Sequence, residues 1–542
     1  MRFHPLIVFS ALAAGCACGQ NDDGSDSRDS QTTPATTDDF TVAIVDPPAS
    51  SKARLVKLLE VSGTIPVRAE VFVDDGGSHQ RDVSPPHSGT EFSAPLVGFR
   101  ADRDYTVAVV LRSIEDDAIV HEETILTTSP KPPIPFPDTL LANSVPGAFE
   151  PGDTLFPVRN PRTDGSARTT FLFLVDEEGE VIWAMESEGI WRDVRLLPDG
   201  TLLGMEEDDV VWTDWADVSR QVYTPPPDLI SYHHEVIARP GGGFFAMASN
   251  TVTVDDFPTA EIFACDPGTS QVVYDSLIVE VDADGTELGR WAMTDLLDTH
   301  RVGVDSFTSI QTYGWDWIHA NGLDYIEETD QFVVSLRHQD AVAWIHRTNH
   351  TLDRILGNDN GWKPEFAALL LDPVGTVQWP FHQHAPEVAW SGDSGTLLVF
   401  DNGNAQTTPC GGPSGYPVTS RIVEYGIDMA TNEVEQLWEF RYGPPLYSSK
   451  MGDADRLETT GHIMGVWGSV GRDIDGSDFE AQGYGDAAGR IVEVDPTTDE
   501  VVWDLLVYES DRAETPNGWE VPRAQRIATV WPEGATGILP GQ

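Results

Sequence analysis

Five of the 14 histidines stand at the polar starts of three apolar runs, together with one arginine that ends a neighbouring run. The histidines are His233, His234, His319, His382 and His384, and the arginine is Arg337. Imidazole can ligate a metal, act as a general acid or base, or attack as a nucleophile. The planar fork of arginine matches the oxygens of sulfate or phosphate. Histidines and an arginine around a tetrahedral anion favour transfer of that group, with one imidazole attacking.

The stretch Trp315–His338 predicts how part of this set is positioned. Leu323, Tyr325 and Ile326 indicate one strand, residues 332–336 indicate a second, and the polar residues 327–330 form the turn between them. A hairpin brings the outer ends of its strands together. We therefore expect His319, Asn321 and Arg337 to meet in space.

From residue 140 to residue 542 an irregular repeat of strands and turns predicts an all-β propeller. One half of the unit is a strand, an acidic or glycine turn and a strand ending near Trp, as in FLFLVDEEGEVIW. The other half is a polar start, an apolar strand, a turn and a second strand, as in HHEVIARPGGGFFAMA. About six such units are present, so six blades fit best and five or seven stay open.

The polar starts hold the same place in every unit, on the strand nearest the expected axis. We therefore predict that they converge on one mouth of the central channel. The residues at these starts are Arg192-Asp193, His233-His234, His319 with Asn321, His382 with His384, Asp453 with Asp455, and Arg523. Asp453, Asp455 and Arg523 have no assigned role.

The residues before the propeller divide into four predicted segments. Residues 1–15 indicate a lipoprotein-type signal peptide, with lipidation at Cys16, although Ala13 stands where such signals usually have Leu and Cys18 is an alternative. Residues 16–39 are polar and predict a disordered tether. Residues 40–130 alternate in short runs and predict a small β-sandwich of fibronectin III-like pattern, and residues 131–139 form a proline-rich linker.

The composition sets limits on partners and cofactors. The formal net charge is -55, with 88 acidic and 33 basic residues, and such a surface repels nucleic acid and anionic membranes. Membrane contact is therefore expected only through the N-terminal lipid. Cys265 and Cys410 could form a disulfide in an oxidising compartment, and the lack of a CxxC pattern argues against structural zinc. We expect no metal and no cofactor.

Several segments resemble those of the bacterial arylsulfate sulfotransferase (ASST) family. They are DWIHANGLDYIEETDQFVVSLRHQD, YHHEVIARPGGGFFAMA, FHQHAPEVAWSGDSGTLLVFDNG and SRIVEYGIDMATNEVEQLWEF. The resemblance implies an exported six-bladed propeller with an N-terminal β-sandwich. It also implies an enzyme that moves a sulfuryl group from an aryl sulfate to a phenol through a sulfohistidine, by ping-pong kinetics and without a nucleotide donor.

The resemblance also implies residue roles. His384 matches the nucleophile, Arg337 the sulfate-binding arginine, and His319 and Asn321 the histidine and asparagine of the family's HxN element. The HHE segment matches a further histidine, which is either His233 or His234, with strand parity favouring His234. His382 beside His384 leaves open which imidazole attacks, and we favour His384 because it directly precedes the strand.

Two other functions fit the same sequence. A non-catalytic propeller could recognise a surface partner, and a metal-dependent propeller enzyme such as a lyase could use the histidines as ligands. We expect a periplasmic or cell-surface protein acting on small aryl sulfates and phenols, either as a monomer or as a homo-oligomer.

Overall fold

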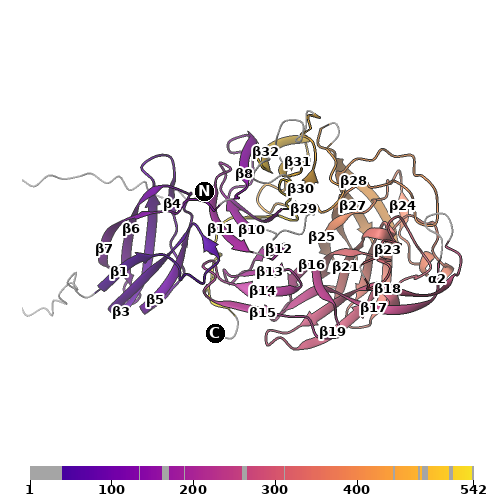
Figure 1. Ribbon diagram of the computed structural model, residues 1–542, viewed down its shortest axis with the longest axis horizontal. Coiled ribbons are helices and arrows are strands. Elements are labelled where there is room, and N and C mark those ends of the chain that lie inside the picture. Colours follow the sequence, from indigo (N-terminus) through magenta and orange to yellow (C-terminus); the bar gives the residue numbers. More distant parts are fainter. Residues whose placement is uncertain are drawn as a thin grey trace, which may run out of the picture.

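The structure is a computed structural model that describes residues 40–133, 135–160, 170–187, 189–258, 265–310, 312–443, 446–473, 476–478, 486–511 and 517–539. These residues are nearly all in strands and turns (Figure 1), so the all-β class is confirmed. The described helical segments are three single turns: α1 (Met293–Leu296), α2 (Pro364–Ala367) and the 3-10 turn η2 (Arg337–Gln339). The predicted leader, Cys16 and the tether 16–39 lie outside the described residues.

The first sheet is built around one long strand, β3 (Val56–Asp74). The first part of β3 pairs with β1 (Phe40–Val45) and β5 (Ser88–Val97). Its last part pairs with β4 (Gln80–Asp82) and β6 (Asp104–Ser113). Strand β7 (Ile119–Thr128) pairs with β6 and completes the sheet, and all of these pairs are antiparallel. Buried and less buried residues alternate along β6, as expected for a sheet with one face on a core.

Six further sheets, here S1 to S6, follow one another along the chain. S1 contains β33 (Gln525–Ile527), β9 (Asp153–Arg159), β10 (Thr170–Val175), β11 (Val181–Ser187) and β2 (Ala53–Arg54). S2 contains β12 (Trp191–Leu196), β13 (Leu202–Glu206), β14 (Asp209–Thr213) and β15 (Arg220–Tyr223). S3 contains β16 (Ser231–Ala238), β17 (Phe244–Phe257), β18 (Thr269–Val281) and β19 (Glu287–Ala292).

The remaining three sheets repeat this antiparallel order. S4 contains β20 (Ala320–Ile326), β21 (Gln331–Leu336), β22 (Ala341–His346) and β23 (Thr351–Gly357). S5 contains β25 (His384–Ser391), β26 (Ser394–Asp401), β27 (Arg421–Asp428), β28 (Glu433–Phe440) and the short parallel β24 (Asp372–Val374). S6 contains β29 (Asp453–Arg456), β30 (Ile463–Val470), β31 (Ala488–Asp495), β32 (Glu500–Tyr508) and β8 (Asp138–Ser144). The hairpin predicted around residues 327–330 is β20–β21, with Ile326 opposite Gln331.

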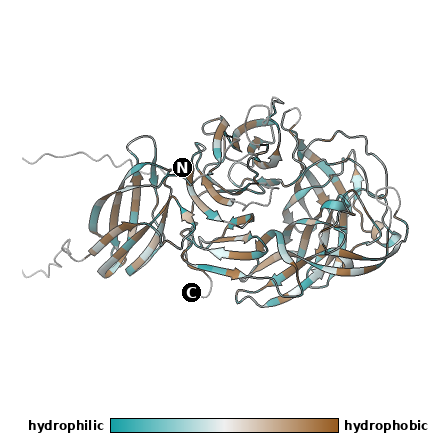
Figure 2. Cartoon of the chain, in the orientation of Figure 1, coloured by the Kyte–Doolittle hydropathy of each residue, from teal (hydrophilic) through white to brown (hydrophobic). Residues whose placement is uncertain are grey.

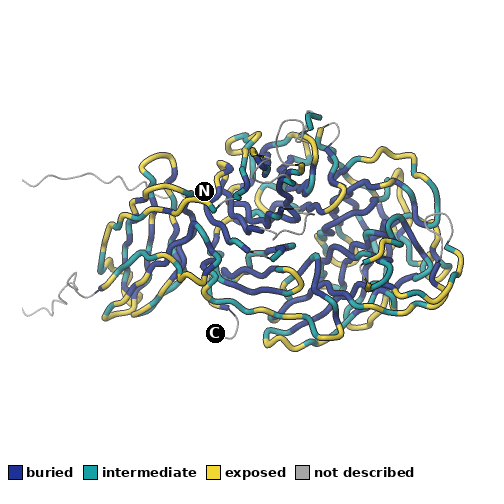
Figure 3. The backbone as a smooth tube through the Cα atoms, viewed as in Figure 1, coloured by how far each residue is buried: buried dark blue, intermediate teal, exposed yellow. Residues whose placement is uncertain are grey.

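Each sheet packs on the next through a separate apolar cluster. Trp191 of S2 packs with Trp183 of S1, Phe332 of S4 packs with Phe245 of S3, and Trp503 of S6 packs with Phe171 of S1. The remaining clusters join S2 to S3, S4 to S5 and S5 to S6. The last sheet therefore packs on the first. Figure 3 shows that much of the backbone of these sheets is buried, and Figure 2 shows hydrophobic residues along many of the same strands.

One strand at the edge of each sheet is here called its inner strand; from S1 to S6 these strands are β33, β12, β16, β20, β25 and β29. Side-chain oxygens link each inner strand to the inner strand of the next sheet. Each oxygen accepts a hydrogen bond from a backbone N–H of the following sheet. The acceptor–donor pairs are Gln525–Leu196 (2.8 Å), Asp193–Val236 (3.1 Å), Glu235–Leu323 (2.6 Å), Asp324–Val388 (2.9 Å), Glu387–Arg456 (2.7 Å) and Asp453–Ala524 (3.1 Å). These bonds run from S1 through S6 and back to S1.

The predicted segment limits are crossed in two places. Strand β2, within the predicted sandwich, pairs with β11 of S1, and the Arg100 guanidinium lies 2.6 Å from the Asp176 carboxylate across the same junction. Strand β8 begins at Asp138, inside the predicted linker 131–139. In the described part of the chain, no helix has the length and apolar character needed to span a membrane.

Candidate active site

β-Bulges at the inner strands turn the predicted histidines out of the ordinary strand direction. The pairing register shifts between Tyr232 and Val236 in β16, and between His384 and Glu387 in β25. His234 (φ 62°) and His319 (φ 45°) adopt left-handed backbone conformations. A bulge re-aims a side chain, and strained residues of this kind persist where the surrounding structure fixes them.

His384 is held as a neutral imidazole with one free nitrogen. The Asn402 side chain donates from Nδ2 to the carbonyls of Ser448 (2.8 Å) and Met451 (2.7 Å), so its Oδ1 must accept the 2.6 Å bond from His384 Nδ1–H. This arrangement leaves the Nε2 lone pair available. Burial holds the pKa of His384 well below its usual value, and the nearby Arg337 and Arg523 charges add to this effect.

His319 is paired with a buried carboxylate. Its Nδ1 lies 2.5 Å from Asp316 Oδ2, and Asp316 is 2% exposed. Burial alone would raise the pKa of Asp316, but the charge and hydrogen bond of His319 lower it to about 2. The carboxylate therefore stays ionised and can stabilise a positive charge on His319.

The His234 ring faces His319, and His233 holds the His234 ring in place by a hydrogen bond. His233 Nε2–H donates to the Ala248 carbonyl (2.9 Å), so its Nδ1 accepts from His234 Nδ1–H (2.7 Å). His234 Nε2 is left free, and the rings of His234 and His319 are 4.9 Å apart. Burial lowers the pKa of His233 to about 4 and that of His234 well below its usual value.

Arg337 is positioned by His338 of S4 and by Asp305, which lies in the loop before S4. Its Nη1 donates to His338 Nε2 (2.5 Å) and lies 3.3 Å from Asp305 Oδ2. His338 Nδ1–H donates to the Asp316 carbonyl (2.6 Å), so its Nε2 is an acceptor and the ring is neutral. The His338 ring also stacks on His319 at 4.8 Å. His338 therefore links the guanidinium to the histidine pair.

His382 has a different environment from His384. It is fully buried, with Nδ1 3.2 Å from Asp340 and Nε2 3.6 Å from Asp305. Burial lowers its pKa, but the two carboxylates outweigh this effect and leave the pKa raised. The two carboxylates favour the protonated form of His382, which cannot attack sulfur, so these contacts favour His384 over His382 as a nucleophile.

Asn321 is bonded within the fold. Its Nδ2 donates to the Gln383 carbonyl (2.9 Å) and its Oδ1 accepts from Ser335 (2.7 Å), so it holds the backbone that leads into His384. The Asn321 carbonyl accepts from Arg523 Nη2 (3.0 Å). Arg523 also bonds Glu235 (3.1 Å) and Asp453 (3.2 Å), which places it between the histidines and the carboxylates of the inner strands.

The prediction that all six polar starts converge on one mouth does not hold. Asp193, Asp453, Asp455 and Arg523 line a separate cavity of about 460 Å³, here called the axial cavity, together with Glu235, Asp324 and Glu387. The name histidine mouth is used below for the set His234, His319, Arg337 and His384. Neighbouring residues of a strand point to opposite sides, so a polar start of several residues is divided between the two sites.

Two groups of described residues have ligand atoms within 4.8 Å of one another and could hold a metal ion. They are Asp305, His338 and His382, and Asp316, His319 and His338. The nitrogens of His338, which both groups share, already bond Arg337 and the Asp316 carbonyl. A metal ion would therefore have to displace the guanidinium or break the carbonyl bond.

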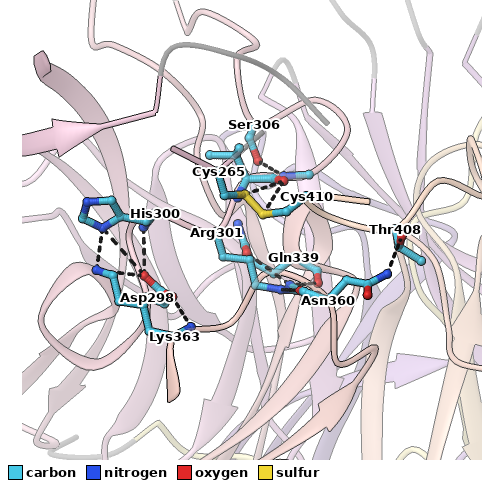
Figure 4. The surroundings of a disulfide bond; sticks show 12 residues. Cys265, Asp298, His300, Arg301, Ser306, Gln339, Asn360, Lys363, Thr408 and Cys410 are labelled. Carbon is cyan, nitrogen blue, oxygen red and sulfur yellow. Dashed lines mark hydrogen bonds and ion pairs between the residues drawn. A yellow bond between two sulfur atoms is a disulfide. The ribbon is translucent and has the colours of Figure 1, made fainter. Parts of the chain in front are cut away.

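Cys265 and Cys410 form a disulfide. Figure 4 shows it beside Arg301, which donates from Nε to the Asn360 carbonyl (2.9 Å). Val302 bridges the two cysteines, because its N–H lies 3.3 Å from Cys265 Sγ and its carbonyl accepts from the Cys410 N–H (3.1 Å). The disulfide thus ties loops of S3, S4 and S5 together near Asp305.

Sequence reasoning missed the partners that set the histidine tautomers: Asp316, His338 and Asn402. Asp316 and His338 lie in the same segment as His319, and Asn402 follows strand β26 in the motif DNG. Polar residues at the end of an apolar strand next to a histidine-bearing strand are a usable signal for Asn402. The residues from Ser448 to Met451, which bond Asn402, left no such signal.

Comparisons with known proteins agree on one family. A family model described as Arylsulfotransferase (ASST) matches residues 141–517. An arylsulfate sulfotransferase AssT from Escherichia coli O6:H1 is 26% identical over 360 residues, which cover 55% of this chain and 58% of that protein. The AssT of Lelliottia amnigena is 24% identical over the same shares of both chains. The chain therefore spans less than two thirds of the length of these curated relatives.

Solved structures give only a weak likeness. A protein of unknown function from Bacteroides caccae has a TM-score of 0.38 at 13% identity, covering 70% of this chain and 100% of that one. The dihydro-heme d1 dehydrogenase NirN has a TM-score of 0.32 at 12% identity, covering 85% of this chain and 76% of that one. Neither likeness bears on function.

Proposed function

The chain belongs to the arylsulfotransferase (ASST) family, and from this premise we propose that it moves a sulfuryl group from an aryl sulfate to a phenol through a sulfohistidine. The observation that supports this proposal most directly is the fixed tautomer of His384. Its Nδ1–H is committed to Asn402 and its Nε2 lone pair is free, which is the state that a nucleophilic imidazole needs.

We propose that S1 to S6 are the blades of a six-bladed propeller and that the first sheet belongs to a fibronectin III-like sandwich. Support comes from the closed series of side-chain bonds between inner strands, and from the packing of S6 on S1. Pairing of β33 with β9 brings the end of the chain into the first of the six sheets, as closure of a ring requires.

In the first half-reaction, His384 Nε2 attacks sulfur. The N–S bond forms as the S–O bond to the aryl group breaks, and the departing phenolate takes a proton from Nε2 of the His319 imidazolium. Arg337 donates to the sulfuryl oxygens, with charge stabilisation aimed at the transition state. His234, whose free Nε2 can only accept, packs against the His319 ring and helps to orient it. Asn402 Oδ1 keeps its bond to Nδ1–H while the His384 ring becomes positively charged.

In the second half-reaction, His319 is the general base. It accepts the proton of the incoming phenol, whose oxygen attacks sulfur as the N–S bond breaks, and His384 leaves as a neutral imidazole. Asp316 stabilises His319 in its charged state, so the same pair serves both halves. Donor and acceptor use one mouth in turn, which gives ping-pong kinetics.

The test is sulfuryl transfer from 4-nitrophenyl sulfate with and without phenol, in wild type and His384→Asn. We expect phenol to accelerate 4-nitrophenol release by wild type, and His384→Asn to lose activity on the order of 10³-fold or more. Wild-type protein exposed to donor alone should gain the mass of one SO3 group, and the variant should not. His350→Asn, at an exposed turn of S4, is the matched control and should behave as wild type.

Three results would point elsewhere. Activity that survives in His384→Asn would exclude the proposed nucleophile. Metal in the purified protein, with activity lost on chelation, would favour a metal-dependent enzyme built on the Asp305–His338–His382 group. Absence of both turnover and labelling in wild type would favour a non-catalytic recognition module.

We also propose that the protein is exported and anchored by a lipid at Cys16. The leader-like residues 1–15 and the polar stretch 16–39 support this proposal. Expression with labelled palmitate should label wild type and leave Cys16→Ser unlabelled. Labelling that persists in Cys16→Ser would exclude this site.

A further inference from the structure

Arg192 is a guanidinium with unused donors. Its Nε donates to the Glu207 carbonyl at 3.3 Å, and no carboxylate of the described residues forms an ion pair with it. Other arginines of the inner strands are paired with acids, as Arg195 is with Glu235 and Arg523 with Asp453. Arginine has five N–H donors, and among the residues that the structure describes none accepts from the two terminal nitrogens of Arg192.

Arg192 lies at the same end of its strand as the histidine mouth. It directly precedes Asp193, whose carboxylate bonds the Val236 N–H in the next inner strand, and His234 stands two residues before Val236. Burial and the nearby Arg159 lower the pKa of Arg192. Its charge in turn contributes to the lowered pKa of His233 and His234, as expected for neighbours in a partly dry site.

The other cations near this end are already neutralised in part. Arg159 and Lys450 share the buried Glu520 carboxylate, at 3.1 Å and 2.7 Å. Arg337 on S4 lies 3.3 Å from Asp305 and is assigned to the sulfuryl group. Arg192, on S2, is near the Glu207 and Asp208 carboxylates but forms no ion pair with them. It is therefore a second cationic position beside the histidine mouth, and it is available to a different group of the substrate.

We propose that Arg192 binds an acidic substituent on the aromatic ring of the substrate, so that the preferred donors and acceptors are aromatic acids. This inference rests on the function proposed above. A guanidinium matches a carboxylate, sulfate or phosphate group with two parallel hydrogen bonds. A chain of net charge -55 repels a doubly anionic substrate, and the positive charge of Arg192 would offset this repulsion at the site.

Binding without turnover is the first test. Calorimetry would compare 4-hydroxybenzoate with its neutral analogue 4-hydroxybenzamide, in wild type, Arg192→Gln and Arg192→Lys. We expect wild type to bind the acid about 10- to 100-fold more tightly than the amide. Arg192→Gln should abolish this preference, and Arg192→Lys should keep part of it. Arg290→Leu, which removes an equal charge on the outer strand β19, is the matched control and should keep it in full.

Turnover of the two sulfate esters, 4-carboxyphenyl sulfate and 4-carbamoylphenyl sulfate, is the second test. Arg192→Gln should raise KM for the acidic donor and leave KM for the neutral donor unchanged. Equal loss on both donors, or no preference for the acid in wild-type binding, would overturn the proposal. If neither donor reacts but the binding preference follows Arg192, the proposed sulfotransfer fails while the anion subsite stands.

Discussion

The histidine mouth and the axial cavity share the inner strands of S3, S4 and S5, yet they use polar atoms in opposite ways. In the mouth, each imidazole forms a hydrogen bond to a fixed partner through one ring nitrogen and keeps the other nitrogen free, as His384 does with Asn402. In the axial cavity, carboxylates such as Glu387 and Asp453 bond the backbone of the next sheet. Hydrogen-bonding capacity is thus left over in the histidine mouth, whereas in the axial cavity it is used to join neighbouring sheets.

The same contrast appears in the electrostatics. Burial lowers the pKa of His234 and His384, and it raises the pKa of Glu235 and Glu387 to about 7. Both shifts favour the neutral form, as expected for groups removed from water. For the histidines the neutral form is the reactive one, whereas for the carboxylates ionisation opposes folding. The predictions below test this division of roles.

Asp316→Asn should have the largest effect, because it removes the charge that stabilises the His319 imidazolium. We expect kcat for 4-nitrophenyl sulfate to fall on the order of 10²- to 10³-fold with little change in thermal stability. Asp275→Asn removes a different buried carboxylate, one that bonds Thr294, and serves as control. If kcat fell equally in both variants, the loss in Asp316→Asn could not be attributed to the missing charge beside His319.

Asn402→Ala should lower kcat about 10- to 100-fold, because the His384 tautomer is no longer fixed. The control is Asn404→Ala. Asn404 donates to the Ser449 carbonyl (2.6 Å) in the same loop but does not bond His384. If both variants lose activity alike, the asparagine acts on the loop and not on the nucleophile.

Glu387→Gln should change stability and leave activity within about twofold. The pKa of Glu387 is about 7 in the folded chain, whereas the pKa of a free glutamate is about 4.3. The folded state therefore binds more protons between these values, and wild type loses stability as the pH rises through this window. The uncharged variant should be more stable than wild type by roughly 1–3 kcal/mol at pH 8, and about equal to it at pH 4.5.

Urea unfolding at the two pH values measures this difference. Glu328→Gln is the control, because the exposed Glu328 also accepts a backbone bond from the next sheet, from the Gly392 N–H (3.1 Å). A gain of the same size in both variants would mean that burial of Glu387 is not the cause.

The smallest effect expected is that of moderate acid on activity. Because the pKa of His384 is lowered well below its usual value, its Nε2 stays unprotonated as the pH falls. Initial rates with saturating donor should therefore change by less than about 10% between pH 7.5 and pH 6.5, whereas an ordinary imidazole would lose about half of its free base. A fall of that size, following one ionisation near pH 6.5, would contradict the assigned environment of His384.

The sequence by itself determined the all-β class, the hairpin β20–β21 and the residues at the starts of the inner strands. These features depend on local patterns: alternating apolar residues, polar turns and the place of histidine before a strand. The pairing of Cys265 with Cys410 was foreseen only as an option, because spacing along a chain does not fix distance in space.

Only the tertiary structure decided which neighbours face the histidine mouth and which face the axial cavity. His234 and Glu235 are adjacent in sequence, yet one ring lies 4.9 Å from His319 and the other side chain bonds Arg523 at 3.1 Å. A bulge of one residue reverses the direction of the side chains that follow, and it leaves no mark in the alternation of residue types. Asn402 and the Ala248 carbonyl, which fix the tautomers of His384 and His233, come from neighbouring strands or their ends, so they become visible only when the sheets are in place.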